Sequence, residues 1–181
     1  MSGLVPYSLP IQGLNNGIHE YEFHIDREFF QHFENSPVVE GDIDLTLILD
    51  KRPNMLLLEF DFVGTIQTEC DRCLAQIDLP VDGVEQLAVK YSEETELEEA
   101  DVIFIHPESE DLNVAQFIYE YIVLAIPIIK VYDCWEENPP VCNQEMLTLL
   151  EAQEQPTKEE EEKEGEDNPL WKELKKFNRN N

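Results

Sequence analysis

Basic residues are scarce in this chain, which has 12 Lys and Arg against 40 Asp and Glu in 181 residues and a formal net charge of −28. Residues 1–150 contain only six of the basic residues: Arg27, Lys51, Arg52, Arg72, Lys90 and Lys130. Binding to nucleic acid rests mainly on Lys and Arg that neutralise phosphates, so this composition argues against direct binding of RNA or DNA. It favours a basic protein as partner, and acidity that serves only solubility is the alternative.

Long apolar runs are also missing. The longest, YIVLAIPII, is interrupted by Pro127, so no transmembrane helix and no membrane partner are predicted. The N-terminal MSGLVPYSLP lacks the basic and apolar regions of a signal peptide, and we therefore expect a cytoplasmic protein. Only seven glycines leave little room for a phosphate-binding loop. Nothing nominates a catalytic residue, a cofactor-binding residue or a small-molecule substrate, so we do not expect an enzyme.

Cysteine is rare as well, and the four cysteines fall into two pairs. Cys70 and Cys73 are separated by two residues in TECDRCL, whereas Cys134 and Cys142 are separated by seven. Thiols stay reduced in the cytoplasm, which favours metal binding or burial over disulfides. A structural zinc ion takes four ligands in a tetrahedron, and the four cysteines are the candidate ligands for one such ion. Thiol redox chemistry and a purely structural role as small buried residues are the alternatives.

Alternation of polar and apolar residues predicts a series of β-strands in the first half of the chain. We expect a short helix capped by Asp26, a hairpin turn at DKRPN, and the cysteine pair Cys70 and Cys73 at a bend between strands. The expected strands are residues 20–25, 42–49, 58–63, 63–69, 74–81, 84–91 and 102–105.

One main helix is predicted after these strands. Asp111 is the expected N-cap and Pro127 marks the end. The apolar residues at helical spacing are Leu112, Ala115, Ile118, Ile122 and Ala125. The predicted fold class is therefore α+β: an antiparallel β-meander sheet or partly open barrel with one main helix packed on it.

The C-terminal part changes in composition. Residues 1–150 are expected to form the α+β domain, and residues 151–167, EAQEQPTKEEEEKEGED, a disordered acidic linker. Residues 168–181 are expected to form a short amphipathic helix, because Pro169 suits the first helical turn and the apolar residues that follow can share one side. So short a helix is unstable alone in water, so we expect it to dock on its own domain or on a partner.

Several of these motifs occur in an order that resembles the large ribosomal RNA subunit accumulation protein family, also called the YceD-like family. Cys70, Arg72, Cys73 and Leu74 match its C-x-R-C-L segment, and Leu124 to Pro127 resemble its L-x-x-P-like element. The segment NPLWKELKKF is similar to its C-terminal element, with Leu170 where the family usually has Arg. Many relatives have a richer cysteine cluster near the position of the second pair.

The resemblance implies a non-enzymatic role in the synthesis, processing or stable accumulation of bacterial 23S ribosomal RNA, and hence in assembly of the large subunit. Because the chain is polyanionic, we expect an acidic adaptor that reaches rRNA indirectly, through a basic ribosomal protein or assembly factor. One alternative is a zinc-binding or thiol-redox protein unrelated to ribosomes. Another is an acidic nucleic-acid mimic that occupies a basic groove and carries acidic side chains at phosphate-like spacing.

Overall fold

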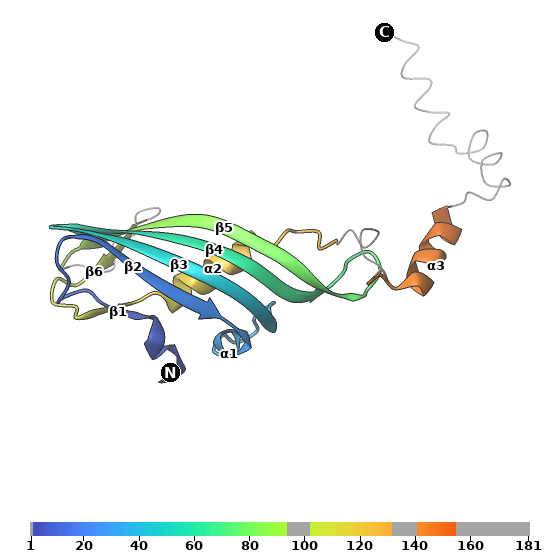
Figure 1. Cartoon of the computed structure of the whole chain (residues 1–181), viewed down its shortest axis with the longest axis horizontal. Coiled ribbons are helices and arrows are strands. Elements are labelled where there is room, and N and C mark those ends of the chain that lie inside the picture. The colour runs from blue at the N-terminus through green and yellow to red at the C-terminus, as the bar shows by residue number, and fades with distance from the viewer. Residues whose placement is uncertain (1, 94–101, 132–140, 155–181) are drawn as a thin grey trace, which may run out of the picture. The chain divides into compact units, whose positions relative to one another are not determined.

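The computed structural model describes residues 2–93, 102–131 and 141–154 (Figure 1). The chain divides into two compact units, Met1–Val141 and Cys142–Asn181. The first unit contains the sheet and its helices, and the second contains helix α3, Gln144–Glu154, which was not expected from the sequence. Residues 155–181, with most of the predicted linker and the predicted C-terminal helix, lie outside the described residues.

The first unit is built on a five-stranded sheet whose strand order follows the sequence. Its first four strands are antiparallel neighbours, and the last strand pairs in parallel with the fourth. The predicted α+β class and meander are therefore confirmed, and the sheet is not closed into a barrel. The strands are β2 (Gly17–Ile25), β3 (Glu40–Arg52), β4 (Met55–Glu69), β5 (Gln76–Tyr91) and β6 (Val102–Ile105).

Two of the expected strand boundaries are wrong. Residues 58–69 belong to one continuous strand, β4, and residues 76–91 belong to another, β5, and the two pair without interruption from Met55↔Lys90 to Glu69↔Gln76. The apparent break in β4 comes from Gly64, which stands opposite Ile43 on β3. A Cβ atom there would overlap the backbone of β3, so glycine is needed in mid-strand for close packing and is not a strand end.

One face of the sheet forms the core of the unit. Every second residue from Ile43 to Leu49 on β3 and from Leu56 to Phe62 on β4 is almost completely buried, including Leu47 and Phe60, both 0% exposed. Helix α2, Ala115–Ala125, covers this face, where the ring of Tyr121 lies 5.2 Å from that of Phe60 in an edge-to-face contact. Figure 1 shows α2 running beneath the long, curved strands.

The start of α2 differs from the prediction. Asp111 is not its N-cap, because Asp111–Asn113 form a short strand, β7, that pairs antiparallel with β1, Ser8–Pro10. In this pair Leu112 stands opposite Leu9, and both are buried, so Leu112 is a strand residue and not part of the helix. The side chain of Asn113 instead accepts a hydrogen bond from the N–H of Ala115, at 3.0 Å. The helix ends before Pro127, as predicted.

The N-terminal segments close the same core from the side. A 3-10 helix, η1 (Ser2–Tyr7), precedes β1, and the ring of Tyr7 contacts that of Phe23 on β2 at 5.4 Å. Helix α1, Arg27–Phe30, follows β2, and Asp26 caps it as predicted, with its carboxylate accepting from the N–H of Glu28 at 2.9 Å. These segments and α2 all pack on the core face, which leaves the opposite face of the sheet without a covering helix in the described part of the first unit.

Candidate functional site

The CxxC motif forms a tight knuckle, residues 70–75, between β4 and β5. The N–H of Cys70 donates to the carbonyl of Ala75 and the N–H of Leu74 donates to the carbonyl of Cys70, both at 2.9 Å. Leu74 has a φ of 57°, in the left-handed region that a tight turn requires. The predicted bend is therefore confirmed. The side chains of Cys70 and Cys73 are both buried, each only 1% exposed.

Of the four predicted zinc ligands, Cys70 and Cys73 are brought together in this one turn. Cys142 lies in the second unit and is disulfide-bonded, and Cys134 lies outside the described residues. Among the residues that the structure describes, no group of three or more His, Cys, Asp or Glu is arranged to hold a metal ion. The four-cysteine zinc site stays a prediction.

The setting of the knuckle bears on the redox alternative. Redox-active cysteine pairs lie at a helix N-terminus and expose their reactive thiol. Cys70 and Cys73 instead lie in a turn between two strands, and both side chains are buried. This setting favours a structural or metal-binding role over thiol exchange.

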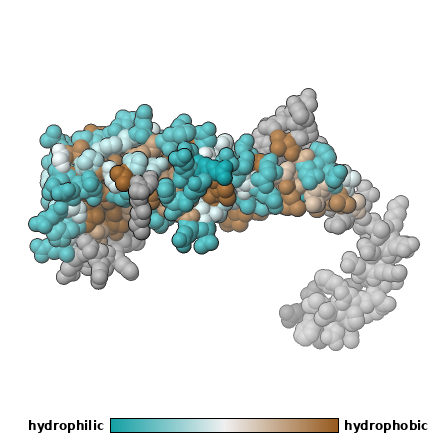
Figure 2. Space-filling model, turned by 90° about the horizontal axis from the view of Figure 1, so that it is seen from below, coloured by the Kyte–Doolittle hydropathy of each residue, from teal (hydrophilic) through white to brown (hydrophobic). Residues whose placement is uncertain are grey.

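A strap, residues 127–131, crosses from the end of α2 to the knuckle. Asp71 and Lys130 join them through two hydrogen bonds: the N–H of Asp71 donates to the carbonyl of Lys130 at 2.8 Å, and the N–H of Lys130 donates to Oδ2 of the Asp71 side chain at 2.7 Å. The strap holds Ile128 and Ile129 in the open, 99% and 70% exposed. Figure 2 shows exposed hydrophobic patches of this kind between hydrophilic residues on the side seen there.

The uncovered side of the sheet, which we call the acidic face, is dominated by carboxylates. They occupy the outward positions of β2 to β5, where each strand alternates between buried and exposed residues. The acidic face carries Glu20, Glu22, Glu40, Asp42, Asp44, Asp50, Glu59, Asp61, Asp78 and Asp82. The polyanionic character of the chain was predicted from its composition, but this surface was not, although carboxylates at every second position of a strand were its signal in the sequence.

The strand register places these side chains in rows across the acidic face. One row runs His24, Asp44, Val63, Asp82 over four neighbouring strands. A second row runs Glu22, Thr46, Asp61, Val84. Neighbouring strands are about 4.8 Å apart and alternate residues about 6.7 Å apart, so several carboxylates lie within one Debye length of each other.

His24 is held by two of these carboxylates. Its Nδ1 lies 3.0 Å from Oδ1 of Asp44, and its Nε2 lies 3.8 Å from Oδ1 of Asp42. The hydrogen bond to Asp44 raises the pKa of His24 above its ordinary value, and the negative charges of Asp42, Asp44 and Asp26 act in the same direction. The acidic face therefore favours a positive charge at the one histidine placed on it in the described strands.

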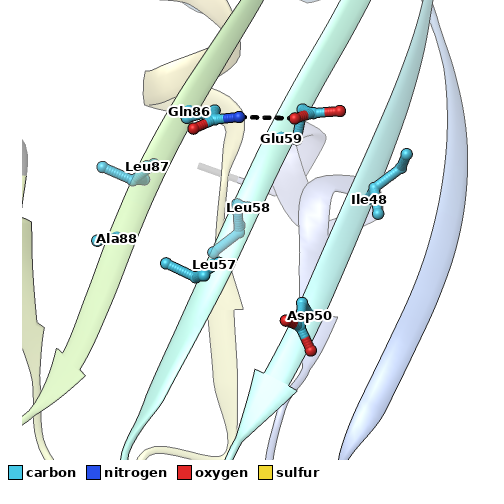
Figure 3. A pocket seen from close by; sticks show the side chains of 8 residues that line it. All are labelled: Ile48, Asp50, Leu57, Leu58, Glu59, Gln86, Leu87 and Ala88. Carbon is cyan, nitrogen blue, oxygen red and sulfur yellow. Dashed lines mark hydrogen bonds between the residues drawn. The ribbon is translucent and has the colours of Figure 1, made fainter.

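An open hollow of about 390 Å³ lies toward the other end of the acidic face (Figure 3). Its lining includes three apolar residues from neighbouring strands: Ile48 of β3, Leu57 of β4 and Ala88 of β5. Two carboxylates, Asp50 and Glu59, also line it, and Glu59 accepts a hydrogen bond of 2.7 Å from the side chain of Gln86. The hollow thus combines an apolar floor with negative charge.

Comparison with known proteins identifies the family. A family model described as large ribosomal RNA subunit accumulation protein YceD matches residues 58–178. The chain belongs to the YceD family. The match begins in β4 and includes the knuckle, β5, α2 and the strap, so the resemblance inferred from TECDRCL is confirmed. The family is described as an accumulation protein for ribosomal RNA of the large subunit, and that description names no enzymatic activity.

No curated protein and no solved structure matches the chain. In the part of the chain that the structure describes, no helix has both the length and the apolar character needed to span a membrane.

Proposed function

We propose that this YceD family member supports the accumulation of large-subunit ribosomal RNA as a non-enzymatic acidic adaptor, which binds a basic ribosomal protein or assembly factor and reaches rRNA through it. The family match supports the link to rRNA. The observation that carries the adaptor role is the acidic face, where ten carboxylates occupy the outward positions of four strands.

The electrostatics favour a protein partner over RNA. RNA binding depends on cations that displace counterions from phosphates, and the acidic face presents the same sign of charge as the RNA backbone. A ribosomal protein rich in Lys and Arg carries the opposite charge, so long-range attraction speeds its encounter with this surface. An acidic protein that binds such a partner shields its charge until the partner meets rRNA.

The predicted helix in residues 168–181 is proposed as a tethered docking element. A linker raises the local concentration of such an element near a partner that already touches the first unit. Removal of residues 155–181, which leaves α3 intact, is expected to reduce the recovery of partners while the thermal unfolding temperature of the remainder is unchanged. A lower unfolding temperature would show instead that the segment packs on its own chain.

Affinity purification of the tagged full chain from cells tests the adaptor role. We expect a basic ribosomal protein or assembly factor to be enriched and to stay bound after nuclease treatment. After crosslinking and washing under denaturing conditions, we expect rRNA to be attached to that partner and not to the tagged chain. Recovery of rRNA crosslinked directly to the tagged chain, with no basic protein enriched, would contradict the proposal. A parallel measurement of mature large-subunit rRNA in cells without the chain tests the family role independently.

A further inference from the structure

We infer that the acidic face is a docking surface for a Lys- and Arg-rich segment of a partner protein, and that the hollow between Ile48 and Leu57 takes the aliphatic part of one of its side chains. The inference rests on the proposed function for the kind of partner. It goes further in assigning the surface, the residues and the chemistry of the bound segment.

The acidic face has far more negative than positive charge. The cationic side chains at its outward positions in the described strands are Lys90, whose Nζ lies 5.9 Å from the centre of the Phe104 ring, Arg52, which is paired with Asp50 at 2.8 Å, and His24, which is paired with Asp44. No ion pair to Lys or Arg joins Glu20, Glu22, Asp61, Asp78 or Asp82 within the residues that the structure describes. A cationic segment that covers the face therefore meets carboxylates that are still available.

The carboxylates of the acidic face are spaced like the basic residues of a regular cationic segment. Carboxylates two residues apart on one strand, such as Asp42 and Asp44, are separated by about 6.7 Å along the strand. Basic residues at alternate positions of an extended segment have the same separation, and those at positions i and i+4 of a helix lie about 6 Å apart. A segment with either pattern can contact carboxylates on β3, β4 and β5 at the same time.

The hollow suits the aliphatic stems of Lys and Arg side chains. These side chains bury their methylene groups along apolar surface and keep the charged end near polar groups. Ile48, Leu57 and Ala88 provide the apolar surface, and the carboxylates of Asp50 and Glu59 stand beside it (Figure 3). A surface that served only to keep the chain in solution would have no need of an apolar hollow between carboxylates.

Binding of a probe peptide to the full chain tests the inference. The probe is a short fluorescein-labelled peptide of Arg, Lys and Leu, followed by fluorescence anisotropy at physiological ionic strength. The triple variant Asp44→Asn, Asp61→Asn, Asp82→Asn removes three charges from adjacent strands of the acidic face. The matched control Glu34→Gln, Glu93→Gln, Glu110→Gln removes three charges from exposed positions outside the strands.

We expect the face variant to bind the peptide about tenfold more weakly and the control variant to differ from the parent chain by less than about twofold. Zero-length carbodiimide crosslinking of the peptide to the unmodified chain needs no variant. We expect the crosslinked carboxylates to be those of β3, β4 and β5.

Three results would overturn the inference. Equal loss of binding in both variants, with crosslinks mainly to the Glu residues of 159–162, would show attraction to any negative charge of the chain. Tighter peptide binding after Lys172→Gln, Lys175→Gln, Lys176→Gln would show that this chain's own C-terminal segment occupies the acidic face. Binding of a single-stranded RNA probe that the face variant abolishes would assign the face to nucleic acid.

The two proposals fail in different ways. If the peptide ignores the acidic face but a basic protein copurifies with the chain, the docking surface is wrong and the adaptor role stands. If the peptide binds the acidic face specifically but no basic protein copurifies and rRNA levels are unchanged in cells carrying the face variant, the adaptor role is wrong and the docking surface stands.

Discussion

Asp71 and Lys130 are joined by two hydrogen bonds, one from the N–H of Asp71 to the carbonyl of Lys130 and one from the N–H of Lys130 to the carboxylate of Asp71. The two residues are 59 positions apart in the chain. Their contact ties the knuckle, with its buried cysteines, to the strap after α2. This link connects the C-x-R-C-L segment and the L-x-x-P-like element, the two motifs of the family resemblance that lie in the first unit.

We expect Asp71→Ala to destabilise the first unit by about 1 kcal/mol, because it removes a charged acceptor that is partly exposed to water. Amide hydrogen exchange at Lys130 should become faster as the strap opens. Glu69→Ala, at a neighbouring exposed position, is the control and should change the free energy of unfolding little. An unchanged exchange rate at Lys130 in Asp71→Ala would contradict the role of this contact.

Gly64→Ala is expected to destabilise the chain by about 2–3 kcal/mol, measured as a shift of the urea midpoint. The added Cβ would overlap the carbonyl oxygen of Asp42 and approach Cα of Ile43 to 2.5 Å, and backbone atoms cannot move aside as a flexible side chain can. Gly13→Ala is the matched control, because nothing lies within 4 Å of a Cβ there. Equal midpoints for the two variants would show that β3 and β4 separate without cost at this point.

The protonation of His24 predicts how the stability of the folded protein depends on pH. Its pKa is raised in the folded protein, first by the hydrogen bond to Asp44, so the folded state holds the proton more tightly than the unfolded chain does. The contribution of His24 to stability is therefore present in full below the unfolded pKa and is lost as the pH rises through the higher folded pKa.

An NMR titration of the His24 ring checks this directly. We expect a midpoint above the ordinary value of 6.5 in the parent chain and a lower midpoint in Asp44→Asn. Asp61→Asn, which alters the same face without touching His24, is the control. A midpoint that does not respond to Asp44→Asn would show that the hydrogen bond is not formed in solution.

The zinc site can be tested by metal analysis of chain purified under reducing conditions. The four-cysteine prediction expects about one zinc per chain, lost in both Cys70→Ser and Cys142→Ser. Zinc removal should then loosen the knuckle, seen as faster amide exchange at Leu74. If the purified chain contains no metal, whether or not its thiols are partly oxidised, the zinc prediction is contradicted. Cys70 and Cys73 would then serve as small buried residues of the turn.

The sheet was predictable because its signal is local. A strand with one buried face repeats every second residue, so residues such as Leu45 and Leu47 reveal their own conformation. The same periodicity placed the knuckle between two strands. The expected boundary at residue 63 was wrong, because the inward position next to it, Gly64, has no apolar side chain and cannot be told from a break until the opposing Ile43 is known.

The parts that were missed depend on distant partners. Leu112 fits a helical spacing with Ala115, but it is a strand residue because Leu9, about a hundred residues earlier, pairs with it. Similarly, the carboxylates on alternate residues of β3 and β4 could be read from the sequence. That these carboxylates form one uncovered surface could not be read from the sequence, because only the contact of Tyr121 with Phe60 shows which side of the sheet α2 covers.

In the described part of the first unit no helix covers the acidic face, and this also governs how copies of the chain interact with each other. Two bare sheets of mixed β-branched and aromatic residues would stack and exclude water, the first step toward a fibril. Here each copy presents rows of like charge, so face-to-face stacking is repelled, and a one-residue slip of β3 would bury Asp42 and Asp44 in place of Ile43 and Leu45. The carboxylates proposed to bind a cationic partner therefore also oppose self-association of the chain through this face.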